Sequence, residues 1–477
     1  MRVATLCLAA LVVLAGCSGA VTTSPSDAAD ATDSPDPTAT PTPSPTPDET
    51  ATEDPSAGSG YPDDPAEDVV GWEKGYWHNE SIAVDNGDGL NDSEFEMVLA
   101  RTMARVEVIR EKEFQKDLTV EFITRQELQD RGLFSFRENE WRDQYWEAAF
   151  VVGEDTSTAE AFTDLYSVVV DGYYGSGTIV TVQENPDQPR IDPTVLAHEV
   201  GHALSGVDRV EGPTRPLTAD ERLALRSEEE GQASWVDTQY EQRCGEQWEC
   251  IERPESAEET PDRSVNMGLY LQFAAPYTLG QGLIEHEYER KGVEGVNDVQ
   301  RYPPTSMEQV VHPETYREDE PVDVTIADRS ANDWTQLRRT GGRFGEVVLY
   351  TMLWKNGVIE TKDVDVRVDQ QTGLNYSHPA TEGWGGDAVI AYENDGSYGY
   401  VFKSVWDSEQ DAAEFQAAYL ELLEKRGAEQ VDDHTYVIES GPYADAFRVV
   451  RQGDTLVVVN APTVDALDEV HPTNASA

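Results

Sequence analysis

Basic residues are scarce in this sequence of 477 residues. Lysine and arginine together number 35 against 92 aspartates and glutamates, which gives a net charge of −57 and a pI of about 4.2. Most of the few basic residues are arginine rather than lysine. A nucleic-acid-binding protein needs a basic surface that neutralises phosphates. The composition therefore excludes binding to nucleic acid through a basic footprint.

The acidity does not make the whole chain disordered. Hydrophobic residues make up 38% of the sequence, with 10 tryptophans and 20 tyrosines, which is enough apolar material for a packed core. Dense surface carboxylates and few lysines are typical of proteins from halophiles, because high salt screens the self-repulsion of such a surface. An acidic protein from a low-salt environment is the less favoured alternative.

Long hydrophobic runs are also few. The run from Val3 to Gly16 is too short to span a bilayer comfortably, and it follows a single basic residue. This pattern predicts a signal peptide at 1–16. The stretch Leu14-Ala15-Gly16-Cys17 resembles a lipobox, in which Cys17 becomes the lipidated first residue. A plain signal peptide with a chance cysteine is the weaker alternative. The chain is therefore expected on the extracellular face of the cell membrane, anchored by lipid rather than spanning.

Cysteine is scarce as well, with four in the chain. Cys7 lies in the predicted signal peptide and Cys17 is the predicted lipid site, which leaves Cys244 and Cys250 in the stretch CGEQWEC. Outside the cell these two are expected to form a disulfide. A zinc-binding pair is the alternative, but no second cysteine or histidine pair occurs at the spacing of a zinc finger.

The rest of the chain divides by composition. Residues 17–66 are rich in Ser, Thr, Pro and Asp and predict a disordered stalk. Aromatic residues begin abruptly after it, and 67–380 is expected to form the main folded domain. Residues 381–466 predict a small α+β unit, and 467–477 a frayed tail. The fold class expected for the chain is α+β.

Several local patterns place elements in the main domain. The stretch 85–96 does not match a calcium-binding loop, because alignment of its glycine with the loop's glycine puts non-ligand residues at the first and last ligand positions. It therefore predicts a turn before a helix at about 91–112. A strand is expected at 118–123, and 166–183 predicts a β-hairpin. Asp192 and Pro193 are suited to the start of the next helix.

That helix carries VLAHEVGHAL, residues 195–204. His198 and His202 are four residues apart, so they share one helix face and can bind one zinc ion together. Glu199 would then lie beside the metal and could take a proton from a water that zinc activates. Two solvated helical histidines are the alternative, but the helix cap and the preceding hairpin favour a zinc site.

A catalytic zinc usually has a third protein ligand. Asp208 follows His202 at the spacing of the aspartate-liganded zincins, but Ser205 stands where that pattern has glycine. The second source is the helical stretch 225–240, which carries Glu228, Glu229 and Glu230. On a helical wheel Glu229 shares a face with apolar residues of this stretch. The residues alone leave the third ligand open.

A resemblance favours one choice. Four stretches of the sequence resemble a family of surface lipoproteins from halophilic archaea. They are EEGQASWV, QYEQRCGEQWEC, PYTLGQGLIEHEYERKG and, most specifically, YPPTSMEQVVHPETY, residues 302–316. That family carries an H-E-x-x-H motif and is grouped with the Glu-zincin (gluzincin) metallopeptidases, and the resemblance extends over most of 67–460. It implies a zincin-like fold and an E-G-x-A element after the motif helix, here Glu230, Gly231 and Ala233. The resemblance thus makes Glu230 the expected third ligand.

Peptide hydrolysis also needs a donor that stabilises the tetrahedral anion. His312, in EQVVHPETY, is the first candidate, and a buried histidine satisfied by backbone is an equally good interpretation. Tyr277 and Tyr316 are weaker alternatives. Asp237 lies two helical turns after Glu230 and could orient a ligand histidine.

These patterns together predict a lipid-anchored cell-surface zinc metallopeptidase. Its catalytic residues would be Glu199 and His312, and its Zn²⁺ ligands His198, His202 and Glu230. Its substrates would be extracellular or envelope proteins and peptides. One alternative is a non-catalytic surface binding or structural protein on a zincin fold, and another is a zinc hydrolase that acts on a non-peptide bond.

Overall fold

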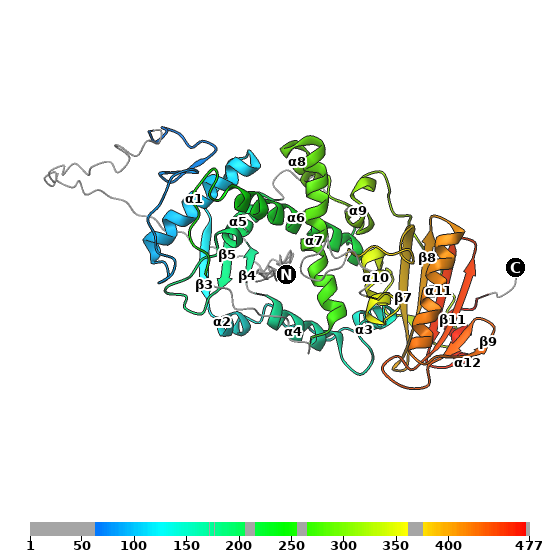
Figure 1. Ribbon diagram of the computed structural model, residues 1–477. Helices are drawn as coiled ribbons and strands as arrows, with labels where there is room; N and C mark the ends of the chain where they lie inside the picture. The colour runs from blue at the N-terminus through cyan, green and yellow to red at the C-terminus, as the bar shows by residue number, and fades with distance from the viewer. Residues whose placement is uncertain are drawn as a thin grey trace, which may run out of the picture.

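The computed structural model describes residues 63–170, 172–175, 177–205, 215–254, 265–360 and 375–473. The predicted signal peptide, Cys17, Asp208 and the predicted stalk up to residue 62 lie outside the described residues. The fold is mixed α+β, as expected from the sequence. Figure 1 shows a largely helical body joined at one end to a β-sheet unit formed by the C-terminal part of the chain.

Long helices build the body. The main ones are α1 (Asp92–Arg110), α5 (Pro193–His202), α6 (Ala219–Arg243), α7 (Met267–Lys291) and α8 (Val293–Arg301). Helix α1 begins at Asn91, whose side chain accepts from Ser93 N and Glu94 N while Glu94 bonds back to Asn91 N. This capping box confirms the predicted turn and helix after residue 85. Helix α6 packs against both α5 and α7.

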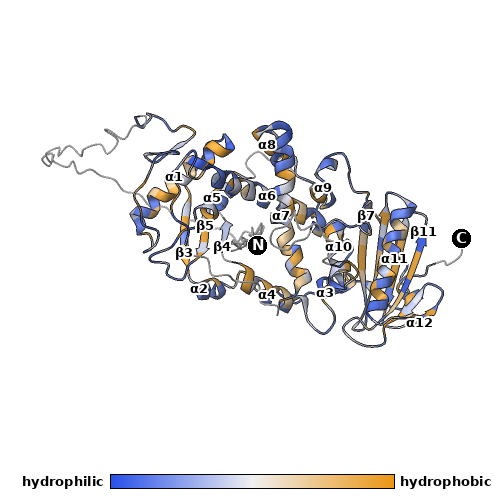
Figure 2. Ribbon diagram, viewed as in Figure 1, coloured by the Kyte–Doolittle hydropathy of each residue, from blue (hydrophilic) through white to orange (hydrophobic). Residues whose placement is uncertain are grey.

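Shorter elements complete the body. They are β1 (Trp72–Glu73), β2 (Tyr76–Trp77), α2 (Arg125–Asp130), α3 (Glu140–Ala148), α4 (Thr158–Val169), α9 (Glu308–Val311), η1 (Pro313–Thr315) and α10 (Gly345–Lys355). Figure 2 shows that α4 is largely hydrophobic, whereas α8 is mostly hydrophilic. Among the described residues, no helix combines the length and apolar character that crossing a bilayer requires.

A three-stranded sheet precedes the motif helix. Its order is β3 (Thr119–Ile123), β5 (Thr178–Val182) and β4 (Gly172–Gly175), with β3 parallel and β4 antiparallel to β5. The strand predicted at 118–123 is confirmed. The hairpin predicted over 166–183 is confirmed only from Gly172 onwards, because 166–169 belong to α4. Ser157 caps that helix, and its apolar residues recur at the helical period.

The C-terminal unit is a seven-stranded antiparallel sheet. Its order is β6 (Thr335–Gln336), β7 (Trp384–Asn394), β8 (Ser397–Trp406), β12 (Thr455–Ala461), β11 (Ala446–Gln452), β10 (Thr435–Val437) and β9 (Glu429–Asp432). Helix α11 (Glu409–Lys425) packs on one face, and α12 (Val464–Val470) on the other. Because side chains alternate between the two faces of a strand, the adjacent residues Val401 and Phe402 belong to different apolar clusters.

Two predicted boundaries of this unit need correction. The sheet begins with β6 at Thr335, well before the predicted start at 381, because Thr335 and Gln336 pair with β7. The tail expected to fray from 467 is helical up to Val470. Leu467 and Val470 are fully buried against the sheet, so apolar packing orders this segment. The two units also pack directly against each other across the predicted boundary at 380, since α10 contacts both α7 and β7.

Two glycines allow α6 and α7 to approach closely. A Cβ atom on Gly231 would lie 2.2 Å from the carbonyl carbon of Gly280, and one on Gly280 would lie 2.0 Å from the carbonyl oxygen of Ser227. Both contacts are with backbone, which cannot move aside without separating the helices. The close crossing fixes how α6 presents its acidic residues to the motif helix.

We expect Gly231→Ala to lower the free energy of unfolding by about 3 kcal/mol, because the added methyl group would overpack the α6–α7 crossing. Gly201→Ala is the matched control. Its Cβ would be in ordinary contact, 3.5 Å from Val236 Cβ, and should change stability by less than about 1 kcal/mol. Chemical denaturation measures both values. Equal stability of the two variants would contradict the close crossing.

Candidate metal centre

The motif helix α5 starts as the sequence predicts. The Asp192 side chain accepts from the backbone N–H of Thr194 and Val195, and Pro193 occupies the first helical position. One turn later the helix is buried on the face that carries the motif. His198 and Glu199 are buried, and the side chain of His202 is about 10% exposed.

The turn before α1 supports the start of the motif helix. Asn86 is buried, and its side-chain oxygen accepts from Ile191 N at 2.9 Å. Its Nδ2 donates to Ile191 O at 2.8 Å and to Glu252 O at 2.7 Å. Asn86 therefore fixes the backbone of Ile191, the residue before the Asp192 cap, and connects it to Glu252 in the segment after α6.

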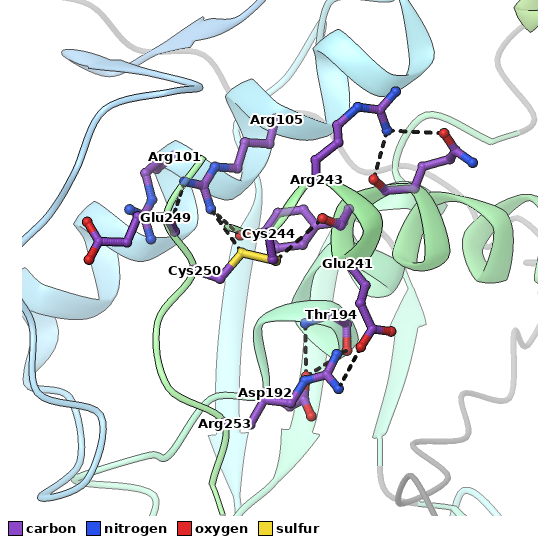
Figure 3. The surroundings of a disulfide bond; sticks show 12 residues. Arg101, Arg105, Asp192, Thr194, Glu241, Arg243, Cys244, Glu249, Cys250 and Arg253 are labelled. Carbon is purple, nitrogen blue, oxygen red and sulfur yellow. Dashed lines mark hydrogen bonds and ion pairs between the residues drawn. A yellow bond between two sulfur atoms is a disulfide. The ribbon is translucent and has the colours of Figure 1, made fainter. Parts of the chain in front are cut away.

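The predicted disulfide joins Cys244 and Cys250, just after the end of α6. Arg105 of α1 is fully buried and donates to Glu249 O at 2.8 Å, inside the same short loop. Figure 3 shows Arg253 lying between the start of α5 and the end of α6, where it reaches Asp192 and Glu241. The disulfide loop thus links the end of α6 to α1, and Arg253, three residues after the loop, contacts the start of the motif helix.

The two motif histidines and a glutamate of α6 converge on one point. Glu230 Oε2 lies 3.5 Å from His198 Nε2 and 3.3 Å from His202 Nε2. His198, His202 and Glu230 form a group of potential ligand atoms that all lie within 4.8 Å of one another. Within the described part of the chain, this group includes Glu230 and not its neighbour Glu229. Of the alternatives left open by the residues, Asp208 is outside the described residues.

The polar atoms at the centre of this cluster fit a metal. His198 Nε2, His202 Nε2 and Glu230 Oε2 are buried, and among the described residues none has a hydrogen-bond partner. Both carboxylate oxygens of Glu199 are also buried and also lack a hydrogen-bond partner among the described residues. Buried polar atoms are almost always satisfied, so several such atoms facing one another indicate a missing common partner. Two imidazoles and one carboxylate are a donor set that zinc prefers.

The electrostatics of the cluster also favour a cation. Burial would lower the pKa of His198, but its contacts with Asp237 and Glu230 raise it to about 10. Burial raises the pKa of Glu199 to about 7, with His198 and His202 opposing this rise. Burial would raise the pKa of Glu230 too, but His202, His198 and Arg226 lower it well below its usual range. The carboxylates together stabilise positive charge at the point where the ligand atoms meet.

A second layer of contacts fixes the ligand side chains. Asp237 Oδ2 lies 3.1 Å from His198 Nδ1, which confirms the contact expected from the sequence. The Tyr277 hydroxyl donates to Glu230 Oε1 at 2.9 Å, so Glu230 keeps its other oxygen directed at the histidines. Arg226 donates to the Tyr277 hydroxyl at 3.0 Å and lies 3.5 Å from Glu230 Oε1. Arg226 was not predicted, although its position one turn before Glu230 is a usable signal.

His312 does not join this cluster in the structure. Its Nε2 lies 3.1 Å from a carboxylate oxygen of Glu346, which is fully buried in α10. Burial would lower the pKa of His312, but the hydrogen bond and charge of Glu346 raise it above its usual value. This partner is a carboxylate rather than the backbone expected for a buried histidine. The oxyanion role of His312 stays a prediction, and Tyr277 is the candidate donor that contacts a cluster residue.

Comparison with known proteins gives one match. Residues 335–471 match a family described as a domain of unknown function (DUF8575). This range coincides with the C-terminal sheet from β6 to α12, together with α10. No curated protein and no solved structure matches the chain.

Proposed function

We propose that this chain is a zinc-dependent metallopeptidase of the zincin type. The observation that carries the proposal is the group of buried, unpartnered ligand atoms from His198, His202 and Glu230 beside the equally unpartnered carboxylate of Glu199. A site that bound zinc only for stability would not need a second buried acid, Glu199, next to the ligands. A hydrolytic site needs one as a general base.

The residues have separate tasks in this proposal. His198, His202 and Glu230 would hold the ion. When bound, zinc supplies Lewis acidity that polarises a carbonyl oxygen and lowers the pKa of water to roughly 7. Glu199 accepts the proton of the attacking water on its carboxylate and can pass it to the leaving amine. Asp237 holds the His198 ring, and Tyr277 with Arg226 holds Glu230.

The zincin assignment is part of the proposal. It is supported by a motif helix, α5, that follows a small sheet, and by a later helix, α6, that contributes the glutamate. Strand β4 lies at the edge of the three-stranded sheet and could pair with an extended substrate segment. The disulfide between Cys244 and Cys250 agrees with an extracellular location, since such bonds persist in oxidising compartments. The lipid anchor at Cys17 belongs to the same proposal.

Metal removal and replacement test the function. The purified chain in molar salt should contain one equivalent of zinc and should cleave casein or members of a broad peptide library. Chelation should abolish cleavage, and Zn²⁺ should restore it while Ca²⁺ alone should not. Zinc bound at one equivalent without cleavage of any peptide would favour a binding or structural protein. Hydrolysis confined to non-peptide esters would favour a different zinc hydrolase, and absence of zinc binding would exclude the metal centre.

A further inference from the structure

A second group of potential metal ligands lies away from the zinc cluster. Glu147 of α3, Glu154 in the loop after α3 and Asp445 before β11 each offer a carboxylate oxygen, and these atoms lie within 4.8 Å of one another. Glu147 and Asp445 are buried, whereas Glu154 is exposed. Burial and the charge of Glu154 raise the pKa of Asp445 to about 7, whereas its hydrogen bonds with Asn460 and Glu147 lower it. Burial and the charges of Asp445 and Glu154 raise the pKa of Glu147 well above its usual value.

Two buried amides at this cluster provide an independent sign of a ligand. Gln144 Nε2 donates to Glu147 Oε2, and Asn460 Nδ2 donates to Asp445 Oδ2 at 3.0 Å. The oxygens of both amides are buried and have no hydrogen-bond partner among the described residues. The two ends of an amide are distinguished only by their hydrogen bonds, so each can be exchanged. Exchange would direct both unpartnered oxygens at the carboxyl groups, where a bound cation would be coordinated by amide and carboxylate oxygens together.

We propose that Glu147, Glu154 and Asp445 bind a calcium ion, with the amide oxygens of Gln144 and Asn460 completing the site. The donors are all oxygen, which suits a hard cation and not zinc. Calcium accepts six to eight oxygens at about 2.3–2.6 Å in irregular geometry, so one ion can bridge carboxylates with this separation. This site is independent of the proposed peptidase function.

The site has a path to solvent and a structural consequence. A cavity of about 370 Å³, lined by Glu154, Asp155, Gly441 and Pro442, lies next to it. The two loops already touch, because Glu154 N donates to Pro442 O at 2.9 Å and Gly153 leaves no room for a Cβ beside Pro442. The ion would therefore fasten the loop after α3 to the C-terminal sheet, and so join the helical body to the unit that contains Asp445.

Calcium binding to the full chain tests this proposal. The chain is freed of metal and then titrated with Ca²⁺ in molar NaCl, which screens non-specific attraction to the acidic surface. Equilibrium dialysis should find one tightly bound ion. The melting temperature should rise by about 3 °C when Ca²⁺ is 100-fold above its dissociation constant. Glu154→Gln and Asp445→Asn should each weaken binding at least about 10-fold.

Two controls separate this site from the rest of the molecule. Glu424→Gln changes an exposed acid of α11 and should respond to Ca²⁺ like the wild type. Glu230→Ala alters the zinc cluster and should also keep the full rise in melting temperature with Ca²⁺. The calcium proposal can therefore be tested even if the peptidase proposal fails. Asp445→Asn removes a charge from a repulsive cluster and is expected to fold without calcium. A wild-type melting temperature that ignores millimolar Ca²⁺, or an unchanged response in both site variants, would overturn the proposal.

Discussion

Glu199→Gln is expected to reduce peptide cleavage by about 100- to 10,000-fold while leaving zinc bound. Glutamine has nearly the same shape as glutamate but cannot accept a proton at neutral pH, so the variant removes the general base alone. Glu199 is almost fully buried, and neither of its oxygens has a hydrogen-bond partner among the described residues. The measurement is the rate of cleavage of a peptide substrate in molar salt, with zinc content determined on the same sample.

The stability of this variant is an internal control. Burial raises the pKa of Glu199 to about 7, so the charged side chain is costly to keep inside the fold. A neutral glutamine should therefore keep the melting temperature of the zinc-free chain at or above that of the zinc-free wild type. Loss of cleavage together with loss of zinc or of folding would attribute the effect to structure. Undiminished cleavage with zinc in place would exclude Glu199 as the base.

Local sequence signals predicted the start of the site well. The Asp192 cap and the four-residue spacing of His198 and His202 depend only on near neighbours along one helix, so the sequence determines them directly. The contact between Asp237 and His198 was also expected, because Asp237 lies two turns after Glu230 on the same helix. Helix α1 was predicted for the same reason, from its cap and its apolar period.

The third ligand shows where a helical wheel fails. A wheel of α6 favours Glu229, because that residue aligns with apolar side chains that should face a core. Helix α6 is buried on more than one side, however, since α5 packs against it as well as α7. The apolar face therefore does not identify the face that meets the motif helix. The resemblance to an E-G-x-A element indicated Glu230, and the geometry brings Glu230 to the histidines.

Contacts between distant parts of the chain could not be predicted in this way. The partner of His312 is Glu346, 34 residues later, and a sequence pattern around either residue does not reveal the pair. Asn86 bonds to Ile191 across 105 residues, and the turn predicted around Asn86 does not reveal this contact. The boundary of the C-terminal unit was missed because β6 is only two residues long and is separated from β7 by a helix.

Glu230→Ala is expected to lower zinc affinity by roughly 100-fold or more, because it removes one of three protein ligands. Glu229→Ala is the matched control one position earlier on α6 and should change zinc affinity little. Competition with a chromophoric chelator measures both affinities. The alanine also leaves Tyr277 and Arg226 without the Glu230 carboxylate, so some loss of stability is expected.

Glu230→Gln separates binding from folding, because the amide can still accept from the Tyr277 hydroxyl but carries no charge. It should keep the melting temperature nearer to the wild type than Glu230→Ala does and still bind zinc more weakly than the wild type. Asp208→Ala should leave zinc affinity unchanged, since Glu230 already provides a third ligand atom beside both histidines. Zinc retained in both Glu230 variants but lost in Asp208→Ala would transfer the third-ligand role to Asp208. Glu199 would then keep its role as proton acceptor. Tyr277 and Arg226 would lose their assigned role, because the residue that they hold would not be a zinc ligand.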